Sequence, residues 1–203
     1  MKKNLHRAAV ILLVSISAAT SGCGRTTPTL SPAQTGVSPE QQSADAAGFK
    51  EFSNRVNDYV KLHKSQEVLL PALKPTVSPE AINAHQRALS LKIREARPNA
   101  RPGDIFTPAA QKSFQDVIQS AMQGPRGANM DATLNQGSPL PPISVGVNQP
   151  YPDGVAYTTV PPTLLLVLPK LPDEVVYRVV LHDLLLMDLK ANLVVDVLPG
   201  IIP

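Results

Sequence analysis

Apolar residues and one histidine recur at steps of three and four along residues 49–63, which is the spacing of one face of a helix. Most charged residues of this segment fall elsewhere on the helical wheel. Leu69-Leu70-Pro71 then ends the pattern, because proline cannot continue a helix. The sequence therefore predicts a first amphipathic helix that begins near Phe49, with this face: Phe49, Phe52, Val56, Tyr59, Val60 and His63.

Two further helices are predicted from their start signals. Ser78-Pro79-Glu80 and Thr107-Pro108 each place a capping hydroxyl before a proline that needs no amide partner. Pro98 follows the first of these helices, and Gly124-Pro125 follows the second. Each carries an apolar stripe, made of Ile82, Leu89, Ile93 and Ala96 in one and of Ala110, Phe114, Val117, Ile118 and Ala121 in the other.

Near the C-terminus the pattern changes to short runs of branched aliphatic residues bounded by polar ones, which is typical of buried strands. The runs cover 175–180, 184–187 and 193–198. Their short connections predict an antiparallel meander. Asp188 suits the first position of a type I turn, and Asn192 tolerates the left-handed backbone that closes such a turn.

The fold class that follows is α+β, with about three N-terminal amphipathic helices packed on a small C-terminal antiparallel β-meander. We expect one domain over residues 49–203, made of a helical part (49–123), a loop (124–157) and a β part (158–203). A domain of this length buries a sizeable core without disulfides. The alternative is a helical domain joined by the 124–157 linker to an independent β unit.

The N-terminus carries an export signal. Basic residues up to Arg7 precede twelve uncharged residues, Ala8 to Ala19, and small residues follow. Such a run makes about 18 Å of helix against roughly 30 Å of hydrocarbon, so it predicts a cleaved signal peptide over residues 1–22 rather than a permanent span. Residues 23–48 are rich in Pro, Ser, Ala and Gln, which predicts a disordered stalk.

Thr20-Ser21-Gly22-Cys23 resembles the lipobox of bacterial lipoproteins, in which the cysteine receives a lipid and becomes the new N-terminus. The resemblance implies lipid attachment at Cys23, the only cysteine of the chain. In such lipoproteins, aspartate directly after the cysteine signals retention in the inner membrane. Gly24 occupies that position here, so the resemblance implies the outer membrane of a bacterium with two membranes. Thr20 departs from the usual aliphatic residue, so cleavage after Ala19 is the alternative. That would leave a soluble periplasmic or secreted protein.

Removal of the signal changes the charge balance. Three of the 19 basic residues and none of the 16 acidic ones precede Cys23, which leaves 16 of each in the mature chain. We therefore expect no nucleic-acid partner. One local cluster of basic residues remains, made of Arg87, Lys92, Arg94, Arg97 and Arg101. It is either a solvated helix face or a contact surface for anionic lipid or wall polymer.

Several short stretches resemble a family of exported bacterial proteins with no assigned activity. They include His85-Gln86-Arg87-Ala88-Leu89, Gly103-Asp104-Ile105-Phe106-Thr107-Pro108 and Asn192-Leu193-Val194-Val195-Asp196. The resemblance covers the chain from about residue 49 onward and implies no catalytic or ligand residues. Leu181 lies where the resemblance implies glycine. A leucine there predicts a strained or differently built turn between the first two strands.

The usual motifs of catalysis, phosphate binding and dinucleotide binding are missing. We therefore expect no catalytic, cofactor-binding or metal-binding residues. His63 and His85 lie on neighbouring helix faces, but two histidines are too few for a transition-metal site. Arg178 and Asp196 each interrupt an apolar strand, which favours an edge-exposed face or a structural ion pair, in which Asp183 or Asp188 could also serve as a partner. The less simple interpretation is a polar site in the sheet that binds a ligand.

Two functions remain. The favoured hypothesis is an exported cell-envelope lipoprotein that serves as a non-catalytic binding or structural module for an envelope protein, a lipid or a wall component. The rival is a small extracytoplasmic hydrolase that uses carboxylates such as Asp104, Asp183 or Asp196. A deep pocket lined by two of these carboxylates and a histidine would favour the rival, and an apolar surface would favour binding.

Overall fold

The computed structural model describes residues 38–123, 127 and 145–202, which belong to one compact unit. Three helices come first and a four-stranded antiparallel sheet follows, so the predicted α+β class is confirmed. The helices are α1 (Pro39–Glu67), α2 (Pro79–Ala96) and α3 (Pro108–Met122). They are followed by β1 (Thr158–Thr159), α5 (Pro162–Leu165), β2 (Val175–Val180), β3 (Asp183–Asp188) and β4 (Leu193–Leu198).

Helix α1 begins earlier than the apolar pattern predicts. Its first residue is Pro39 and its N-cap is Ser38, whose side chain accepts a hydrogen bond from the Gln41 amide. The expected disordered stalk is therefore wrong for residues 39–48, which are helical. The physical reason is the same Ser-Pro-Glu start signal that opens α2. The rest of the expected stalk and the signal peptide lie outside the described residues.

Gly48 in this early part of α1 allows α3 to cross closely. A Cβ atom on Gly48 would lie 2.1 Å from Ser113 Oγ and 2.6 Å from the Ala109 carbonyl oxygen. Both distances are below any real contact, and one of the two atoms is backbone. The crossing therefore needs glycine at this position.

The other helix starts are confirmed. Ser78 caps α2 through the Ala81 amide, and Thr107 caps α3 through the Ala110 amide. Proline occupies the start of both helices.

The sheet has the order β1-β2-β3-β4, with every pair antiparallel. Leu181 and His182 form the two-residue turn between β2 and β3, because Val180 pairs with Asp183. Leu181 has φ +55°, the positive value that the first position of this turn requires. The leucine thus adopts the strained conformation in place of glycine, and the register over 175–180 and 183–188 is continuous.

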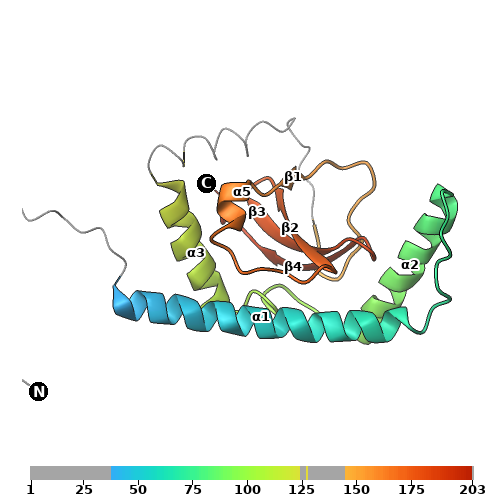
Figure 1. The fold of residues 1–203 in the computed structure, drawn as a ribbon, viewed down its shortest axis with the longest axis horizontal. Helices are drawn as coiled ribbons and strands as arrows, with labels where there is room; N and C mark the ends of the chain where they lie inside the picture. The colour runs from blue at the N-terminus through green and yellow to red at the C-terminus, as the bar shows by residue number, and fades with distance from the viewer. Residues whose placement is uncertain (1–37, 124–126, 128–144, 203) are drawn as a thin grey trace, which may run out of the picture. The chain divides into compact units, whose positions relative to one another are not determined.

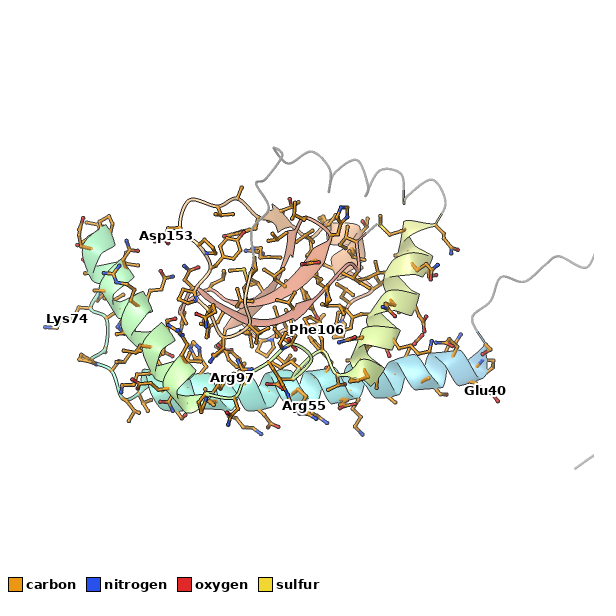
Figure 2. The ribbon with its side chains drawn as sticks, turned by 180° about the vertical axis from the view of Figure 1, so that it is seen from behind. Glu40, Arg55, Lys74, Arg97, Phe106 and Asp153 are labelled. Carbon is orange, nitrogen blue, oxygen red and sulfur yellow. The ribbon has the colours of Figure 1, made fainter. Side chains whose placement is uncertain are left out.

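Helix α1 runs along one face of the sheet, with α3 beside its N-terminal half and α2 beside its C-terminal end (Figure 1). Aromatic rings fill the space between them. Phe52 packs on Phe106, Phe114 and Tyr177, with ring centroids 4.9–6.2 Å apart. Phe106 lies between α1 and the strands (Figure 2). This cluster joins all three layers of the core: α1, α3 with its preceding loop, and the sheet.

The other face of the sheet is covered as well. A second cluster includes Leu185, Met187 and Val194, and it packs against residues of 145–155. Part of this segment is held like an added strand, since the Tyr151 amide donates to the Asn192 carbonyl and the Val194 amide donates to the Gln149 carbonyl. This cover explains why β3 is apolar on both faces.

Strand β4 contains a β-bulge. Leu186 pairs with Asp196 while Met187 pairs with Val194, so Val195 is the extra residue. The bulge shifts the alternation of side chains, because Val195 and Asp196 then both lie on the face that packs against the helices. A regular strand would direct Asp196 to the opposite face.

Candidate functional site

A cavity of about 720 Å³ lies where the end of α1, the α1–α2 connection, α2 and the β3–β4 turn meet. We call it the aliphatic cavity. Its walls are mostly aliphatic side chains from the connection, α2 and the turn, and α1 contributes Glu67. The lining residues are Glu67, Val68, Leu70, Ala72, Leu73, Ile82, His85, Gln86, Leu189 and Lys190.

The local sequence explains why this cavity is open. Pro71 and Pro75 prevent residues 68–78 from forming a helix, so the connection passes from α1 to α2 without regular structure. Its apolar side chains stay in contact with solvent: Val68 is 79% exposed, Leu69 65% and Val77 97%. These exposed apolar side chains next to a cavity make this surface a candidate interaction site.

A buried polar network lies behind one wall. Asp188 and His63 are both fully buried, and His63 Nδ1 lies 2.5 Å from Asp188 Oδ2. The same oxygen accepts a hydrogen bond of 2.7 Å from the Tyr59 hydroxyl, and Asp188 Oδ1 accepts one of 2.9 Å from the Ala191 amide. The expected turn-forming role of Asp188 is thus present, and the same carboxylate also joins β3 to α1.

The network reaches the cavity through an ion pair. His63 Nε2 lies 3.4 Å from Glu67 Oε2, without the alignment of a hydrogen bond. Glu67 in turn accepts a 3.0 Å hydrogen bond from Lys190 Nζ, and both of these residues line the cavity. A chain of contacts therefore runs from the buried carboxylate to the cavity wall.

The electrostatics of the network favour a protonated His63. Burial lowers the pKa of His63, but the hydrogen bond and charge of Asp188 and the charge of Glu67 outweigh it, so the pKa is raised above 6.5. Burial raises the pKa of Tyr59 well above its usual value, and the Asp188 charge adds to this. The hydrogen bond from Lys190 lowers the pKa of Glu67.

This arrangement supplies few groups for catalysis. The buried His63 and Asp188 do not line the cavity, and a general base must come within hydrogen-bond reach of its substrate. Within the described ranges, no group of three or more His, Cys, Asp or Glu residues is placed to hold a metal ion. His63 and His85, which the sequence places on neighbouring helix faces, are not joined. The former binds Asp188, and the latter lines the cavity.

The three carboxylates considered for a hydrolase are held separately. Asp104 accepts the Arg101 amide, Asp183 accepts the Gly200 amide, and Asp196 is buried beside 103–106. None of them lines the aliphatic cavity.

The Asp196 carboxylate is held by hydrogen bonds from backbone amides. Oδ1 accepts from the Gly103 and Val197 amides at 3.0 and 2.8 Å, and Oδ2 accepts from the Ile105 and Phe106 amides, both at 2.7 Å. Burial raises the pKa of Asp196, and the four amides act in the opposite direction. The carboxylate thereby ties the α2–α3 connection to β4.

The expected ion pair between Arg178 and Asp196 is wrong. Asp196 is satisfied by amides because the bulge directs it toward the helices. Arg178 instead stacks over the Tyr157 ring, with its guanidinium carbon 5.0 Å from the ring centroid.

The basic residues of α2 do not form one free face. The Arg97 guanidinium lies 5.2 Å from the centre of the Tyr59 ring and donates to the carbonyl of Val195, the bulge residue. Lys92 pairs with Glu95. Arg87 and Arg94 line a separate cavity of about 410 Å³ near Tyr151. Figure 2 shows Arg97 close to α1.

The network of Tyr59, His63 and Asp188 was not predicted from the sequence. The signal for its helical half was present, because Tyr59 and His63 are four residues apart on the apolar face. Asp188 lies 125 residues after His63, and only the fold brings them together.

The predicted lipid-attachment residue, Cys23, lies outside the described residues. Within the part of the chain that the structure covers, no helix has both the length and the apolar character needed to cross a membrane.

Comparisons with known proteins give no relative. The chain matches no protein-family model, no curated protein and no solved structure.

Proposed function

We propose that this chain is an exported cell-envelope lipoprotein, anchored through Cys23, whose folded part binds the aliphatic chain of a lipid and catalyses no reaction. The observation that carries this proposal is the aliphatic cavity at the end of α1. Its volume of about 720 Å³ lies within the range of small-ligand sites, which are mostly apolar with a few polar groups.

The make-up of the walls supports an acyl chain. Leu70, Leu73, Ile82 and Leu189 are aliphatic, and the described lining includes no Phe, Tyr or Trp. Such walls suit a flexible hydrocarbon better than a flat ring, which gains from aromatic neighbours. Gln86, His85 and Lys190 offer donors for a polar head group at the margin.

The separate positions of the candidate carboxylates favour this proposal over the hydrolase. Acid–base catalysis by two carboxylates needs both at one reacting bond. Asp183 accepts from the Gly200 amide, and Asp104 and Asp196 accept from different amides of the α2–α3 connection. None of the three lines the aliphatic cavity.

Binding is tested by titrating the purified chain with a fluorescent fatty acid and by mass spectrometry of lipid that copurifies with it. We expect saturable binding, and we expect Leu73→Gln with Ile82→Gln to weaken it at least about tenfold because apolar contact is lost. Both side chains are more than 40% exposed, so folding survives the change. Leu181→Gln, on an exposed leucine of the β2–β3 turn, serves as the matched control.

Equal affinity of the wild type and the double variant would contradict the proposal. So would photo-crosslinking from position 73 in intact cells that captures a protein segment and no lipid.

The anchor is tested by changing Cys23 to Ser and fractionating cells. We expect the wild type in the membrane fraction, in the outer membrane where there are two, and the variant in the soluble periplasmic or extracellular fraction. Recovery of both proteins in the soluble fraction would exclude lipidation and leave cleavage after Ala19 as the explanation.

A further inference from the structure

A second cavity, of about 460 Å³, lies beside β2 under the segment that follows β1. We call it the β2-edge cavity. Its walls are largely apolar, and Leu165, Leu171 and Val176 are among them. Among the described residues, its charged lining consists of Lys170 and Arg178, so apolar walls are combined there with two positive charges.

The cavity exists because β1 is too short to cover β2. Thr158 and Thr159 pair with Val179 and Arg178, and the first half of β2 has no strand on that side. Residues 160–172 pass beside this edge instead, and their prolines cannot donate the hydrogen bonds of an added strand. The Tyr177 hydroxyl donates to the Pro169 carbonyl at 3.1 Å, which holds the passing segment in place.

Arg178 is held as a preorganised cation. Its guanidinium stacks on Tyr157 and its Nη1 donates to the Tyr177 carbonyl at 2.9 Å, while its buried Nε has no hydrogen-bond partner among the described residues. Neither Arg178 nor Lys170 forms an ion pair within 4.0 Å in the part of the chain described. A guanidinium fixed by stacking is well suited to bind a planar carboxylate.

We propose that the β2-edge cavity binds a carboxylate carried on a short apolar group. The carboxylate lies between Arg178 and Lys170, and the apolar group contacts Leu165 and Leu171. This chemistry occurs at the C-terminus of a peptide that ends in an apolar residue, and in a short fatty acid. The site is separate from the aliphatic cavity, and no residue lines both.

The test is isothermal titration calorimetry of the full exported chain with four probes. N-acetyl-leucine and hexanoate carry the carboxylate, and N-acetyl-leucine amide and hexanamide are their uncharged counterparts. We expect each carboxylate to bind at least about tenfold more tightly than its amide, since the charge-assisted bonds are lost in the amide. Tighter binding of N-acetyl-leucine identifies a peptide C-terminus as the source, and tighter binding of hexanoate identifies a fatty acid.

Variants assign the binding to this cavity. Arg178→Gln and Lys170→Gln should each weaken carboxylate binding and leave amide binding unchanged. The exposed Lys170 keeps the test valid if Arg178→Gln does not fold. Lys61→Gln, on an exposed lysine of α1, should change nothing.

Equal binding of carboxylates and amides, full affinity for N-acetyl-leucine in Lys170→Gln, or no saturation up to about 10 mM would overturn the proposal. The N-acetyl-leucine results do not depend on the acyl-chain proposal, and hexanoate binding that persists in Lys170→Gln is assigned to the aliphatic cavity.

Discussion

The buried pair of His63 and Asp188 makes the stability of the protein depend on pH. The pKa of His63 is raised in the folded state, so the stabilisation is fully present below its ordinary value of 6.5 and is lost as pH rises through the folded-state value. We therefore expect the free energy of unfolding to fall from pH 6.5 upward, by about 1.4 kcal/mol for each unit by which the pKa is raised. Urea unfolding across this pH range measures it.

His63→Gln should remove this pH dependence, and His85→Gln should keep it, because His85 lies outside the network. A wild type with the same pH dependence as His63→Gln would show that folding does not raise the pKa of His63.

Leu181 carries a conformational cost at a single residue. It has φ +55° and is 49% exposed, so its side chain gains little from burial. We expect Leu181→Gly to stabilise the protein by roughly 0.5–1 kcal/mol, since the left-handed backbone strains a leucine by more than glycine adds to the entropy of the unfolded chain.

The matched control is Leu189→Gly, at a leucine of similar exposure in the β3–β4 turn whose φ is not positive. It should destabilise the protein. Thermal unfolding of both variants checks the pair, and a loss of stability in Leu181→Gly would contradict the strain argument.

Asp196 connects two elements rather than filling a site. In Asp196→Asn, an NH₂ group replaces one of the two carboxylate oxygens, so a donor then faces two backbone N–H donors. We expect a loss of about 3 kcal/mol, the scale of hydrogen bonds to a charged group and of donors left unpaired. Asp104→Asn, at an exposed carboxylate on the same connection, should cost much less, and equal losses in urea unfolding would refute the role of Asp196.

The elements that the sequence predicts well are those with local signals. The capping residues Ser78 and Thr107 predict the starts of α2 and α3. The strands over 175–180 and 193–198 have the bounds that the apolar runs predict. The apolar spacing predicts a start of α1 near Phe49, which is too late, because residues 39–48 are mostly polar and small. Its cap at Ser38 was the better signal.

What the sequence could not predict depends on long-range contact. The bulge at Val195 leaves no mark on the pattern of apolar residues, so the partners of Asp196 could not be found. The two cavities also escape prediction, because each is formed by segments that are distant along the chain. Short β1 gives no periodicity at all.

The packing of the whole domain predicts that its helical half does not fold alone. Phe52, Phe106 and Phe114 share one cluster with Tyr177 and other residues of the sheet. A fragment of residues 38–123 would expose these rings, so we expect it to show a helical circular dichroism spectrum without a cooperative unfolding transition. The full chain should unfold cooperatively under the same conditions. A cooperative transition in the fragment would support two separate domains.

The bulge in β4 has an evolutionary consequence. Val195 sets which side of the strand every later residue occupies, so the length of 193–198 matters as much as its composition. If this strand paired regularly with all its residues kept, Asp196 would face the opposite side and four amides of two segments would lack an acceptor. In sequences descended from a common ancestor, the bulge should therefore be kept, whereas insertions and deletions should accumulate in 68–77.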